Sequence, residues 1–224
     1  ISGGIIWAPM NSHMKKAGID DDRSKSIEYF MSLSQGDINQ PLLEAFIDNC
    51  GEALDFLEEK TDAKFSILDG YPDYYLDRPG ALKGGGRALD NHLFDFSILG
   101  DWASKVRNNG MPLPLTLAET PLGGGTGVIP DDIMSERLEK DSRGFGQALV
   151  GALLKGCLDR GIEPYLDTKA KKLIKSDERI TGIEIEKNGQ TETIIARRGV
   201  IIATGGFEWN KDFVTTFLRG PLRA

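Results

Sequence analysis

The chain has 224 residues, of which 40% are hydrophobic and 27% are charged, and its formal net charge is -7. Such a composition is typical of a folded globular protein that buries a sizeable core, and it excludes disorder as the main state. The acidic balance argues against a nucleic-acid partner, because phosphate contacts need clustered Lys and Arg. No apolar run reaches the ~20 residues that cross a bilayer, so we expect no membrane span.

The first third of the chain predicts two helices and a strand. Residues 24–33 carry apolar side chains at helical spacing, and Ser24 can cap the helix. A stronger helix is predicted over 41–59, where Pro41 suits the first turn and one face is apolar: Leu43, Phe46, Ile47, Cys50, Leu54 and Leu57. A short strand is predicted over 64–68.

Residues 69–130 show no helical or strand period. Glycine triplets at 84–86 and 123–125 punctuate this stretch, and we interpret both as loop glycines because neither lies between a strand and a helix. Long ordered loops are often functional. The aromatic residues here either line an apolar pocket or pack the loop onto the body: Tyr71, Tyr74, Tyr75, Phe94, Phe96 and Trp102.

Regular structure returns in the second half. A helix is predicted over 144–160 with Gly161 as its C-cap. Strands are expected over 171–175, 180–187 and 192–197, and Asn188-Gly189 is a strong signal for a two-residue hairpin turn between the last two. The continuous apolar run 199–203 predicts a parallel strand buried on both faces.

Several residues with possible chemistry have simpler interpretations. Cys50 and Cys157 lie on apolar helix faces, which predicts buried free thiols, although a disulfide between them stays open. Two scattered cysteines fit a reducing compartment, so we expect a cytoplasmic protein. His13 and His92 have no ligand partners at suitable spacing, so we expect no metal site. The acidic run 20–22 is interpreted as a solvated cluster before a helix.

The predicted strand 199–203 ends in small residues, Ala203-Thr204-Gly205-Gly206. Backbone without bulky side chains at the carboxyl end of a strand lets a flat ligand lie against the main chain. The alternative is that the glycine pair simply makes a turn.

The order of these motifs resembles the fumarate reductase and 3-ketosteroid dehydrogenase family of FAD-dependent oxidoreductases. The resemblance covers nearly the whole chain and rests on "SGGIIWAPMN", "RGFGQALVGALLKGCLDRGIEPYLDTKAKKLI", "ATGGFEWN" and "FLRGPLRA". The segment "GYPDYYLDRPG" is more similar to 3-ketosteroid Δ1-dehydrogenases than to fumarate reductases. The family resemblance as a whole implies an α/β fold. This fold would be a partial, Rossmann-like FAD-binding domain with a partial parallel sheet, flanking helices and an antiparallel β-meander.

The resemblance also implies roles for individual residues. The flavin and its diphosphate arm would lie against Ser2, Gly3 and Gly4, and the adenine edge would meet the backbone of Ala170. The second side of the cofactor would be flanked by Ala203, Thr204, Gly205 and Gly206. Tyr74 matches an active-site tyrosine that supports the catalytic base by hydrogen bonding, with Tyr71 and Tyr75 as competitors for that position.

The chain also departs from the family pattern. It lacks the first glycine motif, G-x-G-x-x-G, whose helix N-terminus holds the pyrophosphate, and the substrate domain with its tyrosine base would follow Ala224. We therefore expect residues 1–224 to be an internal fragment that binds FAD weakly or not at all by itself. The implied parent enzyme dehydrogenates a small apolar substrate such as a ketosteroid. The alternatives are a fumarate reductase-like reductase of an unsaturated acid, or an inactive, cofactor-free fragment.

Overall fold

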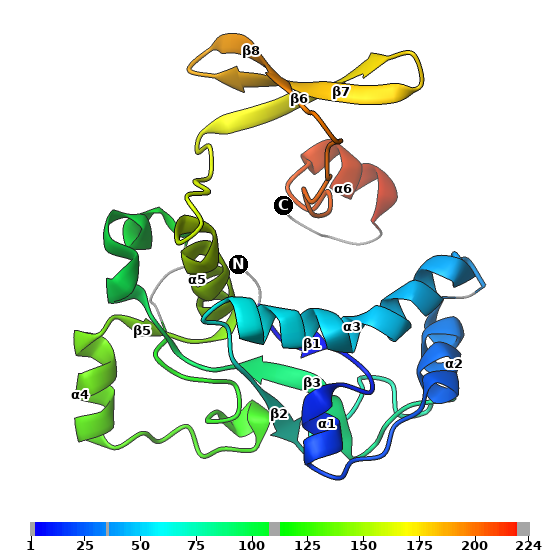
Figure 1. The fold of residues 1–224 in the computed structure, drawn as a ribbon. Helices are drawn as coiled ribbons and strands as arrows, with labels where there is room; N and C mark the ends of the chain where they lie inside the picture. Colours follow the sequence, from blue (N-terminus) through cyan, green and yellow to red (C-terminus); the bar gives the residue numbers. More distant parts are fainter. Residues whose placement is uncertain (1–2, 35, 108–112, 219–224) are drawn as a thin grey trace. The chain divides into compact units, whose positions relative to one another are not determined.

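The computed structural model describes residues 3–34, 36–107 and 113–218, which form two compact units, 1–163 and 164–224. Figure 1 shows the elements of both units. In chain order the first unit holds β1 (Ile6–Trp7), α1 (Ser12–Lys16), α2 (Arg23–Leu33), α3 (Gln40–Lys60), β2 (Phe65–Asp69), β3 (Gly85–Asn91), β4 (Phe94–Asp95), the 3-10 helices η1 (Phe96–Lys105) and η2 (Pro121–Gly123), α4 (Asp131–Glu139), β5 (Ser142–Arg143) and α5 (Phe145–Leu158). The second unit holds β6 (Thr168–Ser176), β7 (Arg179–Lys187), β8 (Gln190–Ile195) and α6 (Lys211–Phe217).

The predicted helices of the first unit are confirmed. Helix α2 begins one residue earlier than predicted, and its cap is the Asp22 side chain, which accepts from the Lys25 backbone N–H, in place of Ser24. Helix α3 has Pro41 in its first turn and buries Leu43, Ile47 and Leu54, whereas Phe46 of the predicted apolar face is exposed.

Strand β3 was missed by the sequence pattern, because it lies in the stretch predicted to be irregular. It is buried along its whole length and is the middle strand of an antiparallel sheet with the order β1-β3-β2. Its sequence, GGRALDN, has no β-branched residue and no alternation, so a local period cannot reveal it. The segment forms a strand because it lies between β1 and β2 and pairs with both.

The main core joins this sheet to α3 and α5. Leu89 of β3 and Leu54 of α3 belong to one buried cluster with Ala148 and Ala152 of α5. Gly151 of α5 allows the helix to approach closely, because a Cβ there would lie 2.7 Å from atoms of both Phe94 and Phe96. Of the aromatic residues that were expected either to line a pocket or to pack the loop, Phe94 and Phe96 are therefore core residues.

The second unit contains the predicted antiparallel meander, β6-β7-β8. Lys187 pairs with Gln190, and the two residues between them both have positive φ, 51° at Asn188 and 75° at Gly189. This is the geometry of a type I′ hairpin turn. The hairpin prediction is therefore confirmed.

The predicted buried parallel strand over 199–203 is wrong. These residues form no strand, and Ile201 and Ile202 are 93% and 67% exposed. A parallel strand needs neighbours at its edges and cover on its faces. Among the described residues every strand pair is antiparallel, and no strand lies beside this run.

Two further expectations need correction. Asp21 belongs to the acidic run predicted to be solvated, but its side chain is buried in an ion pair with Arg87. Both cysteines are free as expected, yet each is half-buried instead of buried.

Candidate active site and cofactor contacts

An aromatic cavity of about 280 Å³ opens in the first unit between β1, α2 and the loop after β2. Its walls are almost entirely apolar and are lined by Ile5, Trp7, Tyr29, Phe30, Leu33, Tyr71, Pro72, Asp73, Tyr74, Tyr75 and Ala88. The Trp7 ring stacks on Tyr29 at a centroid distance of 6.1 Å and meets Phe30 edge-on at 5.0 Å. Such walls suit a flat apolar ligand.

A buried ionic network lies beside this cavity. Arg87 of β3 donates from Nε and Nη2 to the two carboxylate oxygens of Asp21, at 2.9 and 2.6 Å, and from Nη1 to Asp73 at 2.8 Å. Its side chain is 1% exposed. Burial alone would lower the pKa of Arg87, but its hydrogen bonds and charge contacts with the two aspartates outweigh burial and raise it. Two carboxylates and one guanidinium leave one uncompensated negative charge.

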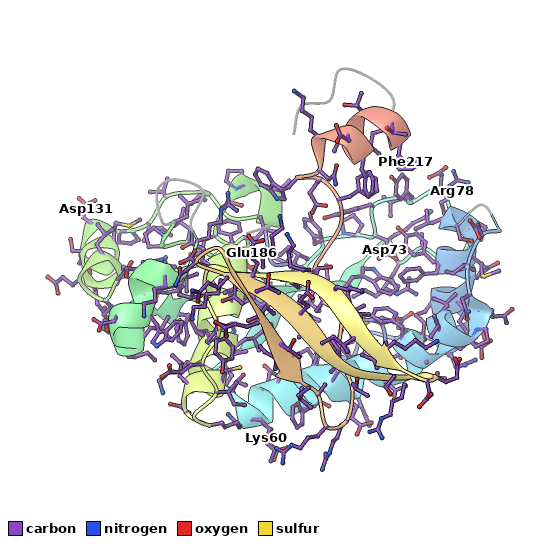
Figure 2. The ribbon with its side chains drawn as sticks, turned by 90° about the horizontal axis from the view of Figure 1, so that it is seen from above. Lys60, Asp73, Arg78, Asp131, Glu186 and Phe217 are labelled. Atoms are coloured by element: carbon purple, nitrogen blue, oxygen red, sulfur yellow. The ribbon has the colours of Figure 1, made fainter. Side chains whose placement is uncertain are left out.

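The Asp73 carboxylate fixes the loop that carries the tyrosines (Figure 2, where Asp73 is labelled). Oδ1 accepts from the Trp7 indole N–H at 2.7 Å, and Oδ2 accepts from the Leu82 backbone N–H at 2.8 Å as well as from Arg87. The Asp73 N–H returns a hydrogen bond to the Leu82 carbonyl at 3.1 Å. The Tyr75 N–H donates to the Tyr29 hydroxyl at 3.2 Å.

The three loop tyrosines differ in exposure. Tyr74 is 76% exposed, Tyr75 is also exposed, and Tyr71 is half-buried. The Tyr71 and Tyr74 rings meet edge-on at 6.3 Å, and the two side chains are hydrogen-bonded. That hydrogen bond, followed by burial, raises the pKa of Tyr71. Tyr74 lines the cavity and, as a mostly exposed residue, stands at its mouth.

Sequence reasoning singled out Tyr74 but missed the residues that hold its loop. Arg87 and Asp73 are far apart in sequence, and Trp7 sits in the glycine-rich opening segment. Tyr29 is the buried aromatic residue of α2, whereas the helical spacing of the sequence indicates Ile27, Phe30 and Met31 as the inward face. An arginine flanked by small and apolar residues, as in GGRAL, is the one signal that could have indicated a buried cation.

The expected cofactor residues of the first unit have different surroundings. Ser2 lies outside the described residues. Gly3 is exposed, and a Cβ there would meet no heavy atom within 4 Å. Gly4 has φ +75°, and a Cβ there would lie 2.5 Å from the Gly146 Cα at the start of α5. Packing against α5 therefore explains the glycine at Gly4, while Gly3 leaves open space.

A buried acceptor beside Gly4 lacks a donor. Asn91 Nδ2 donates to the Gly4 carbonyl at 2.6 Å, but its Oδ1 is buried without a hydrogen-bond partner. Buried acceptors are nearly always satisfied, so this oxygen is a candidate contact for a ligand N–H group. A flavin ring carries such a group, and the residues here fit FAD in that respect.

The expected cofactor residues of the second unit are all exposed. Ala170 lies on β6, paired with Ile185, and the run Ala203–Gly206 has no regular structure. Gly205 has φ +76°, and a Cβ there would meet open space, whereas at Gly206 it would contact the Glu208 carboxylate. Exposed backbone with small side chains fits the close approach of a flat cofactor.

Comparison with known proteins defines the class. The FAD binding domain family matches residues 1–220. The chain is 33% identical over 99% of its length to 4-oxocyclohexanecarboxylate 2-dehydrogenase of Sinomonas cyclohexanicum, of which it covers 39%. It is 28% identical over its full length to 3-oxosteroid 1-dehydrogenase of Comamonas testosteroni, of which it covers 42%. The chain thus spans about two fifths of the length of these curated relatives.

A solved structure is similar to this chain over its whole length. The chain matches 3-ketosteroid Δ1-dehydrogenase of Sterolibacterium denitrificans in complex with 1,4-androstadiene-3,17-dione, with a TM-score of 0.81 and 29% identity. The match covers all of this chain and 43% of that one. In the described part of the chain, no helix is both long and apolar enough to cross a membrane.

The chain belongs to the FAD binding domain family. The predicted family and its cofactor, FAD, are confirmed, and so is the α/β fold class with flanking helices and an antiparallel meander. Among the family's members, the similarity extends to dehydrogenases named for oxosteroids and for an oxocyclohexanecarboxylate.

Proposed function

We propose that this chain is the internal part of a longer FAD-dependent dehydrogenase that introduces a carbon–carbon double bond beside the carbonyl of a cyclic ketone. The observation that carries the proposal is the aromatic cavity with Tyr74 at its mouth and the Tyr71 ring beside it, at a centroid distance of 6.3 Å. The 3-oxosteroid 1-dehydrogenase relatives support the type of substrate.

In this proposal the carbonyl acidifies the hydrogen on the neighbouring carbon, a base takes that proton, and the next carbon loses a hydride as the double bond forms. FAD, when bound, supplies the hydride-accepting chemistry. Tyr74 donates a hydrogen bond to the base, a tyrosine outside this chain. Since an unperturbed phenol has a pKa of about 10, a second phenol that stabilises the phenolate makes proton removal feasible near neutral pH.

The substrate we propose is an uncharged apolar ketone of the ketosteroid kind. No described residue that lines the cavity is basic, and the nearby Arg87 is already shared between two aspartates. A substrate carboxylate would need an unoccupied cation to clamp it. The residual negative charge of the network further disfavours an anion.

A second candidate substrate is a cyclic oxo acid. The relative from Sinomonas cyclohexanicum, named for 4-oxocyclohexanecarboxylate, is 33% identical to this chain. A carboxylate clamp would then be supplied by residues outside the cavity described here. Assays of the full-length protein with a 3-ketosteroid and with 4-oxocyclohexanecarboxylate, side by side, separate the two candidates by their kcat/KM.

The FAD contacts we propose are Ser2, Gly3, Gly4, Ala170, Ala203, Thr204, Gly205 and Gly206. Gly205 permits a sharp test because its Cβ position is open. Gly189 has nearly the same φ, 75°, and equally open space, so Gly189→Ala reproduces the backbone strain without the proposed contact. In the full-length protein, Gly205→Ala should reduce the FAD content of purified protein while Gly189→Ala should not. Equal FAD content in both variants would show that Gly205 only makes a turn.

The chain alone should bind FAD weakly or not at all, because the G-x-G-x-x-G motif that grips the pyrophosphate is not in its sequence. The measurement is flavin absorbance of the purified chain after gel filtration with added FAD. Stoichiometric retention of FAD would contradict the proposal that this chain is a fragment of the binding domain.

A cytoplasmic location is part of the same proposal. The two cysteines of the chain, Cys50 and Cys157, are free thiols, which fits a reducing compartment.

The catalytic assignment is tested by removing one hydroxyl at a time. In the full-length enzyme, Tyr74→Phe should slow ketosteroid dehydrogenation about 10²-fold, the scale of general acid–base assistance, with FAD content unchanged. Tyr71→Phe and Tyr75→Phe are the matched comparisons. Wild-type turnover by Tyr74→Phe with impairment of a neighbour would move the role to that neighbour. Full activity in all three variants would make the loop structural.

A further inference from the structure

The loop of residues 71–75 owes its position to one buried carboxylate. Asp73 stands between Pro72 and Tyr74, and both of its oxygens accept hydrogen bonds from groups far away in sequence or across the loop. Tyr74 itself is mostly exposed, so few contacts of its own hold it in place. The direction of the Asp73 side chain therefore sets where the adjacent phenol lies.

We propose that Arg87 and Trp7, acting through Asp73, are positioning residues for the tyrosines at the cavity mouth. This inference rests on the proposed function. The side-chain donors to Asp73 come from β1 and β3, two paired strands of the buried sheet, so they form a rigid frame. The frame converts a surface loop into a fixed part of the site.

Stability alone is a poor explanation for this network. Taking three charged groups out of water is costly, and apolar replacements of buried ion pairs are often neutral or stabilising. The geometry of the network instead indicates that its role is to orient the Asp73 carboxylate. The planar guanidinium grips Asp21 with two N–H groups and still presents Nη1 to Asp73 and to the Gly80 carbonyl at 3.0 Å. A lysine ammonium retains the charge but cannot reproduce that planar fork.

The length of the Asp73 side chain matters for the same reason. Its Oδ1 and Oδ2 are each within 2.8 Å of their donors from Trp7 and Arg87. One added methylene, as in Asp73→Glu, keeps the charge and the acceptors but must displace either the carboxylate or the loop. A misplacement of about 1 Å in a catalytic group costs on the order of 10²-fold in rate.

The test uses the full-length flavoprotein and the variants Asp73→Glu and Arg87→Lys. The control is Glu119→Gln, which breaks another two-pronged ion pair, with Arg137 at 2.6 and 2.9 Å, but lies outside the cavity lining. The rate of flavin reduction by a 3-ketosteroid is measured without oxygen in a single turnover, together with steroid Kd and FAD content. Both variants should reduce flavin about 10- to 100-fold more slowly, with Kd and FAD content within about 3-fold of wild type. The control should keep the wild-type rate.

Hydrogen exchange of the amides of residues 71–82 gives a readout that needs no activity. It should rise in Asp73→Glu and Arg87→Lys but stay at the wild-type level in Glu119→Gln. Unchanged exchange, or an unchanged single-turnover rate in both variants, would overturn the positioning role. If wild-type protein oxidises no ketosteroid, the proposed function fails, while the exchange experiment still decides whether the network fixes the loop.

Trp7→Phe covers the case in which the charged variants do not fold. It keeps an aromatic ring against Tyr29 and Phe30 and removes only the indole N–H that Asp73 accepts. We expect faster amide exchange over 71–82 and a flavin-reduction rate lowered several-fold. Wild-type exchange and rate in Trp7→Phe, with the charged variants unfolded, would also overturn the proposal.

Discussion

The two units of this chain bury their apolar residues to very different degrees. In unit 1, strands, helices and loops close around Leu89 and Phe96, both fully buried, and a second small cluster forms around Leu68. In the described part of unit 2, the buried apolar residues are only Ile185 and Val214. Ile195, Ile201 and Trp209 of the same unit are largely exposed.

The difference shows that unit 1 carries its own core, whereas the meander of unit 2 is held together by backbone pairing across its two hairpins. The proposal that the chain is part of a longer flavoprotein accounts for the low burial of these apolar side chains in unit 2.

The largest effect is expected from Leu89→Ala. Leu89 is fully buried in the middle strand, and removing a buried leucine side chain leaves a cavity that costs about 2–5 kcal/mol. Urea unfolding followed by tryptophan fluorescence measures the loss. Ile195→Ala in β8, where the side chain is 70% exposed, is the matched control and should cost no more than about 0.5 kcal/mol. Equal losses would mean that unit 2 is covered in solution.

The next effect concerns the packing of the opening segment on α5. Gly4→Ala should destabilise unit 1 by at least about 2 kcal/mol, because positive φ and overlap with the Gly146 backbone act together. Gly3→Ala has open space around it and should be nearly neutral. Thermal unfolding of both variants checks this, and a neutral Gly4→Ala would show that the segment does not pack on α5.

A smaller effect is expected in unit 2. Gly189→Ala puts a side chain at φ 75° in the hairpin turn but meets no neighbour, so the strain alone should cost about 1 kcal/mol. Hydrogen exchange of β7 and β8 should accelerate, while exchange in β3 should not change. Faster exchange in β3 as well would indicate that the two units unfold together.

The smallest effect concerns the Cys50 thiol of α3. Burial raises its pKa above the ordinary value, so the reactive thiolate is scarcer at a given pH. Alkylation of Cys50 by iodoacetamide should therefore be slow near pH 8 and should speed up as the pH rises or in denaturant. Peptide mass spectrometry follows the site. Alkylation at the same rate in native and denatured protein would show that α3 does not protect this thiol.

Local patterns determined much of this protein. The apolar face of α3, the glycine after α5 and the Asn188-Gly189 turn each act within a few residues, and each was correctly predicted. The family resemblance and its cofactor also followed from motifs in the printed sequence. These features depend on periodicity and turn chemistry, which a sequence shows directly.

Tertiary structure decided the rest. The segment GGRALDN has little intrinsic strand propensity, yet it forms the central strand because β1 and β2 pair with it and distant groups hydrogen-bond with Arg87, Asp90 and the Nδ2 of Asn91. The apolar run 199–203 has high strand propensity, yet it forms no strand among the described residues because none pairs with it. A strand is completed by partners that lie elsewhere in the chain, so its sequence alone cannot determine it.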